Sequence, residues 1–153
     1  MSDIVIRLAL QAERSSLEAL QWRASLANSG DRDSLLANPN AIVLPVEQIT
    51  DGHVFVAQRD GVIVGFAAVL TRPDGNAELD ALFVEPTLWK HGVGRLLVEH
   101  CADVARERAS RILHVVGNPH AEGFYAACGF RTTGAVETRF GGGLAMQRGL
   151  GDG

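Results

Sequence analysis

The chain has few cysteines and no excess of positive charge. Its two cysteines, Cys101 and Cys128, show neither a CxxC spacing nor a metal-ligand spacing with histidine, so we expect buried, reduced thiols and no metal. Cys128 stays a candidate reactive thiol, because it follows Tyr125 by three residues. The formal net charge of −4 argues against broad electrostatic capture of nucleic acid or of an anionic membrane.

The chain also lacks long apolar runs, repeats and a cationic leader. No window reaches transmembrane length, and the first residues, with Asp3 and Arg7, do not form a signal-type segment. We therefore expect a cytoplasmic protein that has no membrane partner. The 153 residues and the hydrophobic fraction of 46% suit a single domain with one core.

The first half of the chain predicts a strand, helical segments and three further strands. Residues 4–10 favour a strand, and residues 12–27 favour a helix because apolar residues recur there at helical spacing. Glycines and prolines scatter through residues 28–51, where we expect a short helix and a loop. Residues 53–58 and 62–70 predict two strands joined by a turn at Asp60-Gly61, and a third strand covers residues 77–84.

The strand at residues 77–84 alternates in polarity. Leu79, Ala81 and Phe83 are expected on a buried face, whereas Glu78, Asp80 and Leu82 occupy the other face. The two carboxylates would then be presented together.

The second half predicts two helices and three strands. A mostly apolar stripe of a helix is predicted from positions that recur at helical spacing: Val93, Leu96, Leu97, His100, Cys101 and Val104. Residues 111–116 favour a strand, Asn118-Pro119 starts a further helix, and Gly129 ends it. Residues 130–147 favour two strands around residues 138–143.

A glycine-containing turn joins the strand at residues 77–84 to the helix after Gly94. Gly92 and Gly94 lack the Cβ atoms that would keep backbone N–H groups from an anion, and the positive end of the helix follows. Alone, this turn is more often structural than ligand-binding. A nicotinamide fingerprint would need a further glycine where Leu97 stands, and no phosphate loop of the GK[ST] type is present.

Two segments together resemble the GNAT superfamily of N-acetyltransferases. The first keeps Val84, Pro86, Gly92 and Gly94 of the pattern V-x-P-x-x-R-x-x-G-x-G, although Trp89 stands where arginine or glutamine is usual. The second segment, residues 118–130, nearly completes the pattern N-x-x-A-x-x-F-Y-x-x-x-G-F. The resemblance implies one acetyltransferase domain over residues 1–153, with a core at about residues 4–148. It implies a mixed central β-sheet flanked by α-helices, in the order β-α-α-β-β-β-α-β-α-β-β.

The resemblance also implies acetyl-CoA as the acetyl donor and supplies a set of binding residues. Backbone groups of Leu82, Phe83 and Val84 would pair with the pantetheine arm and polarise the thioester carbonyl. The turn would hold the pyrophosphate, and Asn118 is similar to an asparagine that contacts CoA, although its cap position alone would explain it. The turn residues are Lys90, His91, Gly92, Val93, Gly94 and Arg95.

Two side chains are candidates for proton transfer. Tyr125 resembles the family tyrosine near the CoA sulfur, where a phenol can protonate the departing thiolate; alone it would suggest only a packed aromatic residue. Glu78 resembles the glutamate that serves as base in histone-acetylating members. Asp80 or a water molecule is the alternative base, and a solvent-facing Glu78 without a catalytic role is the alternative to both.

These observations predict direct acetyl transfer from acetyl-CoA to a primary amine of a small molecule in a ternary complex. A protein or peptide acceptor is one alternative, and a non-catalytic acyl-CoA-binding sensor is another, which Trp89 at the usual cationic or amide position leaves open. Many members of the family form homodimers, so exposed strands near residues 138–147 could supply a dimer contact, although they could equally be covered internally.

Overall fold

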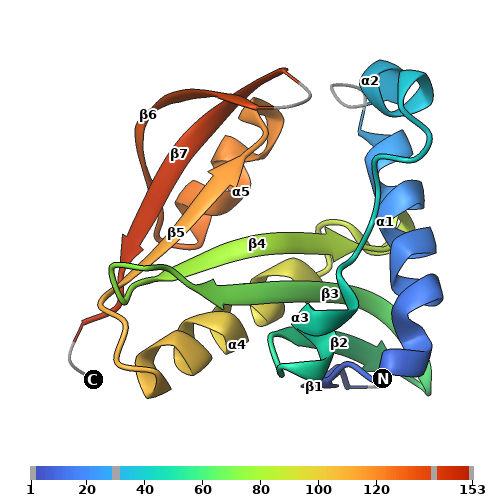
Figure 1. Ribbon diagram of the computed structural model, residues 1–153, viewed down its shortest axis with the longest axis horizontal. Helices are drawn as coiled ribbons and strands as arrows, with labels where there is room; N and C mark the ends of the chain where they lie inside the picture. Colours follow the sequence, from blue (N-terminus) through green and yellow to red (C-terminus); the bar gives the residue numbers. More distant parts are fainter. Residues whose placement is uncertain (1–2, 29–31, 139–140, 152–153) are drawn as a thin grey trace. The chain divides into compact units, whose positions relative to one another are not determined.

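The computed structural model describes residues 3–28, 32–138 and 141–151 of the chain. The sheet has seven strands in the order β1-β2-β3-β4-β5-β7-β6, and Figure 1 labels these strands and the helices beside them. β4 and β5 pair in parallel, whereas β5 pairs with β7 in the antiparallel sense. The predicted mixed sheet flanked by helices is confirmed.

The element bounds follow the predicted segments closely in most of the chain. The strands are β1 (Val5–Leu8), β2 (Val54–Arg59), β3 (Val62–Thr71), β4 (Ala77–Val84), β5 (Ile112–Gly117), β6 (Arg131–Thr138) and β7 (Gly141–Gly149). The α-helices are α1 (Arg14–Ala27), α2 (Arg32–Ala37), α3 (Val46–Thr50), α4 (Val93–Glu107) and α5 (Glu122–Ala127). Short 3₁₀ helices are η1 (Gln11–Glu13), η2 (Pro86–Leu88) and η3 (Pro119–Ala121).

The chain divides into two compact units by its internal contacts. The first unit holds Met1–Ala68 and Ala81–Val98, and the second holds Val69–Asp80 and Glu99–Gly153. β3, β4 and α4 each contribute residues to both units.

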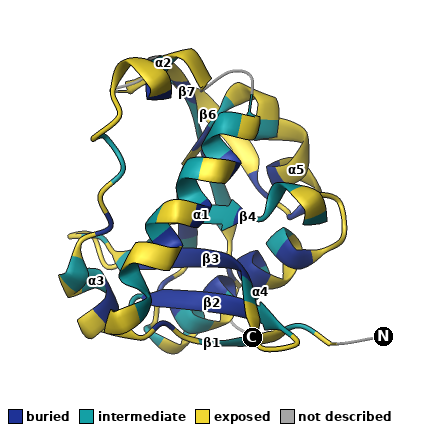
Figure 2. Cartoon of the chain, turned by 90° about the vertical axis from the view of Figure 1, so that its right-hand side faces the viewer, coloured by how far each residue is buried: buried dark blue, intermediate teal, exposed yellow. Residues whose placement is uncertain are grey.

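The core of the first unit lies between α1 and the strands β2 and β3. Leu17 and Leu20 of α1 are fully buried and cluster with apolar side chains of the two strands. On the other face of β3, a Cβ atom at Gly65 would lie 3.1 Å from Leu97 Cδ1, so this glycine lets α4 approach closely. Figure 2 shows β2 and β3 buried along most of their length.

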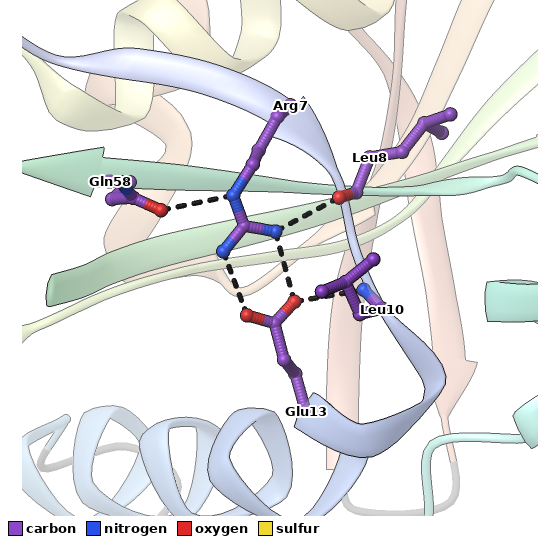
Figure 3. Close-up of polar contacts among 5 residues, drawn as sticks. All are labelled: Arg7, Leu8, Leu10, Glu13 and Gln58. Atoms are coloured by element: carbon purple, nitrogen blue, oxygen red, sulfur yellow. Dashed lines mark hydrogen bonds and ion pairs between the residues drawn. The ribbon is translucent and has the colours of Figure 1, made fainter. Parts of the chain in front are cut away.

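A guanidinium–carboxylate pair fixes the start of the first unit (Figure 3). Arg7 on β1 donates two hydrogen bonds to Glu13 of η1, at 3.0 and 2.7 Å, and a third to the Gln58 side chain. Glu13 also accepts the Leu10 backbone N–H at 2.8 Å. The pair lowers the pKa of Glu13, chiefly through the hydrogen bond from Arg7.

The second unit is built on β5, β7 and β6. β5 pairs with β7 from Ile112↔Gly149 to Gly117↔Leu144, and Arg148 of β7 forms a forked ion pair with Glu99 of α4. The buried side chains of this unit include Leu113, Val115, Tyr125, Cys128, Phe130 and Met146.

Two details differ from the sequence-based expectation. Residues 28–51 hold two short helices, α2 and α3, where we expected one; each is too short to show a clear apolar period. In α4, Leu96 was predicted in the buried stripe but is 46% exposed. Val93, Leu97 and Cys101 are buried as predicted, whereas His100 and Val104 are half-buried. Val98, Ala102 and Ala105 are buried in addition, because small residues at 102 and 105 allow close packing on that side.

The two hairpin predictions can be compared directly. At the β2–β3 turn, Asp60 and Gly61 both have positive φ, 53° and 79°, as the Asp-Gly signal predicts. The β6–β7 pair is also present, but residues 139–140 of its predicted turn lie outside the described residues.

Candidate functional site

The turn between β4 and α4 presents backbone N–H groups at a helix start. Lys90 and Gly92 adopt positive φ, 67° and 89°, and the first bond of the α4 ladder runs from Leu96 N–H to the Gly92 carbonyl. α4 has 15 residues and no acidic side chain in its first turn. Since the first N–H groups of a helix lack partners within the helix, this end suits an anion.

Cationic side chains surround the same turn. Lys90, His91 and Arg95 are exposed, while Val93 is buried and anchors the first turn of α4. Among the residues that the structure describes, neither Lys90 nor Arg95 forms an ion pair with a carboxylate. Both charges therefore stay available to a bound anion, and the arrangement fits a phosphate better than a cation.

The end of β4 presents alternate backbone groups to its two edges. Glu85 N–H donates to the Val64 carbonyl at 2.8 Å, and the Phe83 carbonyl lies 3.0 Å from the position of a Cβ atom on Gly65, so residues 83 and 85 face β3. Because backbone groups alternate along a strand, Leu82 and Val84 face the opposite edge. The Phe83 ring packs against the Phe66 ring, with the two centroids 5.5 Å apart, and this contact holds the end of β4 against the core.

The Trp89 side chain forms a hydrogen bond with one of the backbone groups on this edge of β4. Its indole Nε1–H donates to the Val84 carbonyl at 2.9 Å, although the residue as a whole is 41% exposed. This contact was missed by the sequence-based prediction, which treated Trp89 only as a departure from a motif. A spacing of five residues between a tryptophan and a strand end carries no recognised signal.

An ion pair joins α1 to the residue after β4. Arg23 Nε donates to Glu85 Oε1 at 2.7 Å, and a second nitrogen donates to Oε2 at 3.2 Å. Arg23 is exposed, so the pair contributes little to stability, but it fixes the direction of the Glu85 carboxylate.

Glu78 belongs to the second unit, where it pairs in register with His114 of β5. Residues opposite one another in a ladder project from the same face, so the two side chains are neighbours. Burial and the nearby Arg72 lower the pKa of His114, against the opposing effects of Asp74 and Glu78, and its buried Nε2 has no hydrogen-bond partner within the described part of the chain. Glu78 is half-buried, while Asp80 is exposed and belongs to the same unit.

Tyr125 is the buried residue of α5. Its ring lies edge-on to the rings of Phe124 and Phe130, with distances between ring centroids of 5.1 Å and 5.5 Å. Burial raises the pKa of the phenol well above its ordinary value, with a smaller contribution from Cys128. The phenol therefore stays protonated throughout the physiological range, which suits a proton donor.

Gly117 makes room for this tyrosine. A Cβ atom there would lie 3.0 Å from Tyr125 Cε2 and 2.6 Å from Met146 Cε. Asn118 follows, and its Oδ1 accepts the His120 N–H at 2.9 Å, with Pro119 at the start of η3. The predicted cap role of Asn118 is confirmed; its contact with CoA stays a prediction.

The remaining expectations concern thiols, metals and membranes. Cys101 and Cys128 are both free and buried, as predicted. Within residues 3–28, 32–138 and 141–151, no group of three or more His, Cys, Asp or Glu side chains could hold a metal ion. No helix in the described part of the chain is long and apolar enough to cross a membrane.

The predicted site residues fall into two sets. The first unit holds the β4 end and the turn, with Leu82, Phe83, Val84 and residues 90–95. The second holds Glu78, Asn118 and Tyr125.

Comparison with known proteins gives family and fold. Residues 16–130 match the acetyltransferase (GNAT) family. The peptidyl-lysine N-acetyltransferase YjaB of Salmonella typhimurium is 31% identical over 135 residues, 88% of each chain. YjaB of Escherichia coli is 42% identical over 59 residues, 39% of each chain.

Solved structures share the fold at lower identity. A GCN5-related N-acetyltransferase from Rhodopseudomonas palustris superposes with a TM-score of 0.81 at 20% identity, over 97% of both chains. The putative acetyltransferase yncA from Salmonella typhimurium, solved with its cofactor acetyl-CoA, gives 0.72 at 22% identity, over 99% of this chain and 96% of that one.

Proposed function

The chain belongs to the acetyltransferase (GNAT) family and is an acetyl-CoA-dependent acetyltransferase, and from this premise we propose that it acetylates the side-chain amine of lysine in proteins or peptides. The observation that carries this acceptor is the 31% identity to the peptidyl-lysine N-acetyltransferase YjaB over 88% of both chains. A small-molecule primary amine, expected from the sequence, is the second candidate. The net charge of −4 favours a cationic acceptor of either kind.

The α4 turn is proposed to hold the pyrophosphate of CoA. Its support is the combination of a helix start without acidic side chains, the left-handed Gly92 and the exposed Lys90 and Arg95. Arginine can contact a phosphate with two parallel hydrogen bonds, whereas lysine adds a point charge and the His91 ring can donate an N–H. Val93 and Gly94 contribute backbone N–H groups of the first helical turn.

The pantetheine arm is proposed to pair with the edge of β4 that faces away from β3. The parallel pairing of β4 with β5 covers Ala77–Leu79, the first three residues of the strand. Further along, Leu82 and Val84 direct backbone groups to that edge, and Phe83 lies between them. A backbone N–H on this edge would stabilise the negative charge that develops on the thioester oxygen.

The reaction needs one base and one acid. A lysine amine is mainly protonated near neutral pH, so we assign Glu78, directly or through a water molecule, to remove the ammonium proton; Asp80 is the alternative. The free amine attacks the acetyl carbonyl, a C–N bond forms and the C–S bond breaks. Tyr125 gives its proton to the departing thiolate and recovers one from solvent, while the excess proton of the acceptor leaves as H⁺. Asn118 is proposed as an additional CoA contact.

A release assay tests the acceptor. Free CoA would be measured with acetyl-CoA and three acceptor sets: lysine peptides, the same peptides with N-terminal amines blocked, and a panel of small primary amines. Lysine-dependent release with blocked peptides, and acetyl-lysine by mass spectrometry, would support the proposal. Release with small amines alone would favour the second candidate, and binding of acetyl-CoA without release in any set would favour a non-catalytic acyl-CoA-binding module.

We also propose a cytoplasmic homodimer. β6 is an edge strand of the sheet, and seven of its eight residues are exposed. An unpaired edge can add a strand from a second copy. Sedimentation equilibrium would distinguish the dimer from a monomer of 16.3 kDa.

A further inference from the structure

Trp89 lies where the family places arginine or glutamine, and its surroundings give it a different task. It follows η2 and precedes Gly92 by three residues, in an extended conformation with φ −61° and ψ 142°. Its indole Nε1–H donates a hydrogen bond of 2.9 Å to the Val84 carbonyl. The residue is 41% exposed, and since tryptophan has no other polar side-chain group, whatever part of its ring is exposed presents aromatic carbon.

The anchoring carbonyl lies on the edge of β4 that is proposed for the pantetheine arm. Glu85 N–H bonds to Val64 and the Phe83 carbonyl approaches Gly65, so both face β3. Val84 therefore directs its carbonyl to the opposite edge. The indole stands at the end of that edge, between the strand and the glycine turn.

The ring changes what the strand edge offers to a ligand. Since the indole N–H already bonds to the Val84 carbonyl, a ligand amide on that edge would share this acceptor or use the carbonyl of Leu82. Beyond it, a chain leaving the strand toward the turn meets the apolar ring rather than a charge. In CoA, the portion that joins the second amide to the pyrophosphate carries two methyl groups, which match an aromatic surface.

We propose that Trp89 is a binding residue for the pantetheine arm, with its anchored indole forming an apolar wall against the dimethyl portion beside the pyrophosphate. This inference rests on the proposed orientation of CoA along β4 and the α4 turn. Trp89 would contribute to CoA binding through apolar contact, whereas an arginine at this position contributes through its charge. CoA binding should accordingly depend less on ionic strength than in a variant that carries arginine at position 89.

The two tryptophans of the chain make the contact observable. Trp22 lies on α1, half-buried, outside every contact used above, so the variant Trp22→Phe leaves Trp89 as the sole indole fluorophore. We would titrate it with 4′-phosphopantetheine, with 3′,5′-ADP and with CoA. We expect 4′-phosphopantetheine and CoA to change the Trp89 emission, and 3′,5′-ADP to leave it unchanged. A response to 3′,5′-ADP alone would overturn the assignment to the arm.

Calorimetry on variants of the otherwise unchanged chain gives the second test. Trp89→Leu should weaken 4′-phosphopantetheine and CoA roughly tenfold, through lost apolar contact, and should leave 3′,5′-ADP binding unchanged. Trp89→Phe keeps an aromatic ring but loses the hydrogen bond to Val84, so its affinity for 4′-phosphopantetheine and CoA should lie between those of the natural protein and of Trp89→Leu. Trp89→Arg should bind CoA well at low salt and lose affinity more steeply than the natural protein as salt rises.

The outcomes separate this inference from the proposed function. Suppose that the natural protein binds CoA and transfers acetyl groups, and that Trp89→Leu binds 4′-phosphopantetheine as tightly as the natural protein does. The role of Trp89 in binding the pantetheine arm is then refuted, whereas the proposed acetyl-CoA site is retained. If the natural protein binds neither CoA nor its fragments, both proposals fail. Circular dichroism of each variant would show whether it folds, and the fluorescence titration of Trp22→Phe does not depend on any change at position 89.

Discussion

Tyr125 illustrates how a buried side chain can serve chemistry that depends on its environment. Its ring is enclosed by Phe124 and Phe130, and burial raises the pKa of its hydroxyl. A raised pKa favours the protonated form, so the proton to be donated is present throughout the neutral pH range. The same burial would make a phenolate in this place costly, and the donor must therefore recover its proton quickly.

Replacing Tyr125 by phenylalanine should lower kcat roughly 100-fold while CoA affinity stays nearly constant, because only the proton donor is removed. Steady-state kinetics together with calorimetry would check this. In the natural enzyme, kcat/KM should not fall between about pH 8 and about pH 10, since Tyr125 keeps its proton there. An unchanged kcat in the phenylalanine variant would remove the acid role.

Glu78 can be tested against a neighbour on the same strand. Glu78→Gln should reduce turnover at least tenfold and remove the acid limb of the pH–rate profile, because an amide cannot accept the ammonium proton. Asp80→Asn is the matched control: it removes one carboxylate from an exposed position of β4. Loss of the acid limb in the Asp80 variant, with a normal Glu78 variant, would transfer the base role to Asp80.

The sequence predicted the candidate residues but not their contacts. Gly92 and Asn118 carry recognisable backbone roles, because positive φ and helix capping restrict the residue type. The bond from Trp89 to Val84 has no such signature, since any donor that reaches the carbonyl could form it. Likewise, the pairing of Glu78 with His114 depends on strand register, which is set by long-range packing.

At the scale of elements, strong periodicity was the reliable signal. β4 was predicted with its observed bounds, and the alternation of buried and less buried residues holds from Ala77 to Asp80. It fades at Ala81 and Phe83, which are half-buried and pack against the α1 cluster. Residues 28–51 were predicted poorly because α2 and α3 have only 6 and 5 residues, and tertiary contacts decide such short helices.

The α5–β5 packing gives an element-scale prediction. Gly117→Ala places a methyl group 3.0 Å from the Tyr125 ring and 2.6 Å from Met146 Cε; the methionine can yield, but the enclosed ring cannot do so freely. We expect a loss of about 1–3 kcal/mol in the free energy of unfolding, together with reduced turnover. Urea unfolding and the release assay would measure the two effects.

Gly149→Ala is the control for that substitution. It also replaces a glycine at a strand position of the second unit, but a Cβ atom there meets nothing within 4 Å. Its unfolding midpoint should stay within experimental error or rise slightly, as expected for alanine in place of a flexible glycine. Equal destabilisation of both variants would mean that strand geometry, rather than contact with Tyr125, governs the effect.

For the whole molecule, the fold was more predictable than the acceptor. Two short motifs were sufficient to identify a fold that is retained at 20% identity over 97% of both chains. The acceptor is not encoded in those motifs, because they concern the acetyl donor. Surface side chains that select an acceptor follow no fixed spacing, and so the family resemblance left small amines and peptides open.

Titration of carboxyl groups also has consequences for the whole molecule. Glu13 and Asp74 have lowered pKa values, the first chiefly through Arg7 and the second chiefly through the Asn76 backbone N–H. A lowered pKa contributes stability that is present above the unfolded value and is lost as pH falls through the folded value. The free energy of unfolding should therefore decline below about pH 4.

At alkaline pH the free energy of unfolding should fall as pH rises, rather than as pH falls, and Cys101 provides the test. Burial raises the pKa of its thiol from 9.0 to about 12, and Tyr125 shifts in the same direction. Above about pH 9 the unfolded chain releases protons that the folded chain retains, so the free energy of unfolding falls as pH rises. Cys101→Ala removes this term, at the cost of some packing at every pH. From about pH 7 to about pH 10.5, the free energy of unfolding of the Cys101→Ala variant should fall by roughly 2 kcal/mol less than that of the natural protein. Urea unfolding at both pH values measures the difference, and parallel declines would show that the Cys101 thiol ionises as readily in the folded chain as in the unfolded one.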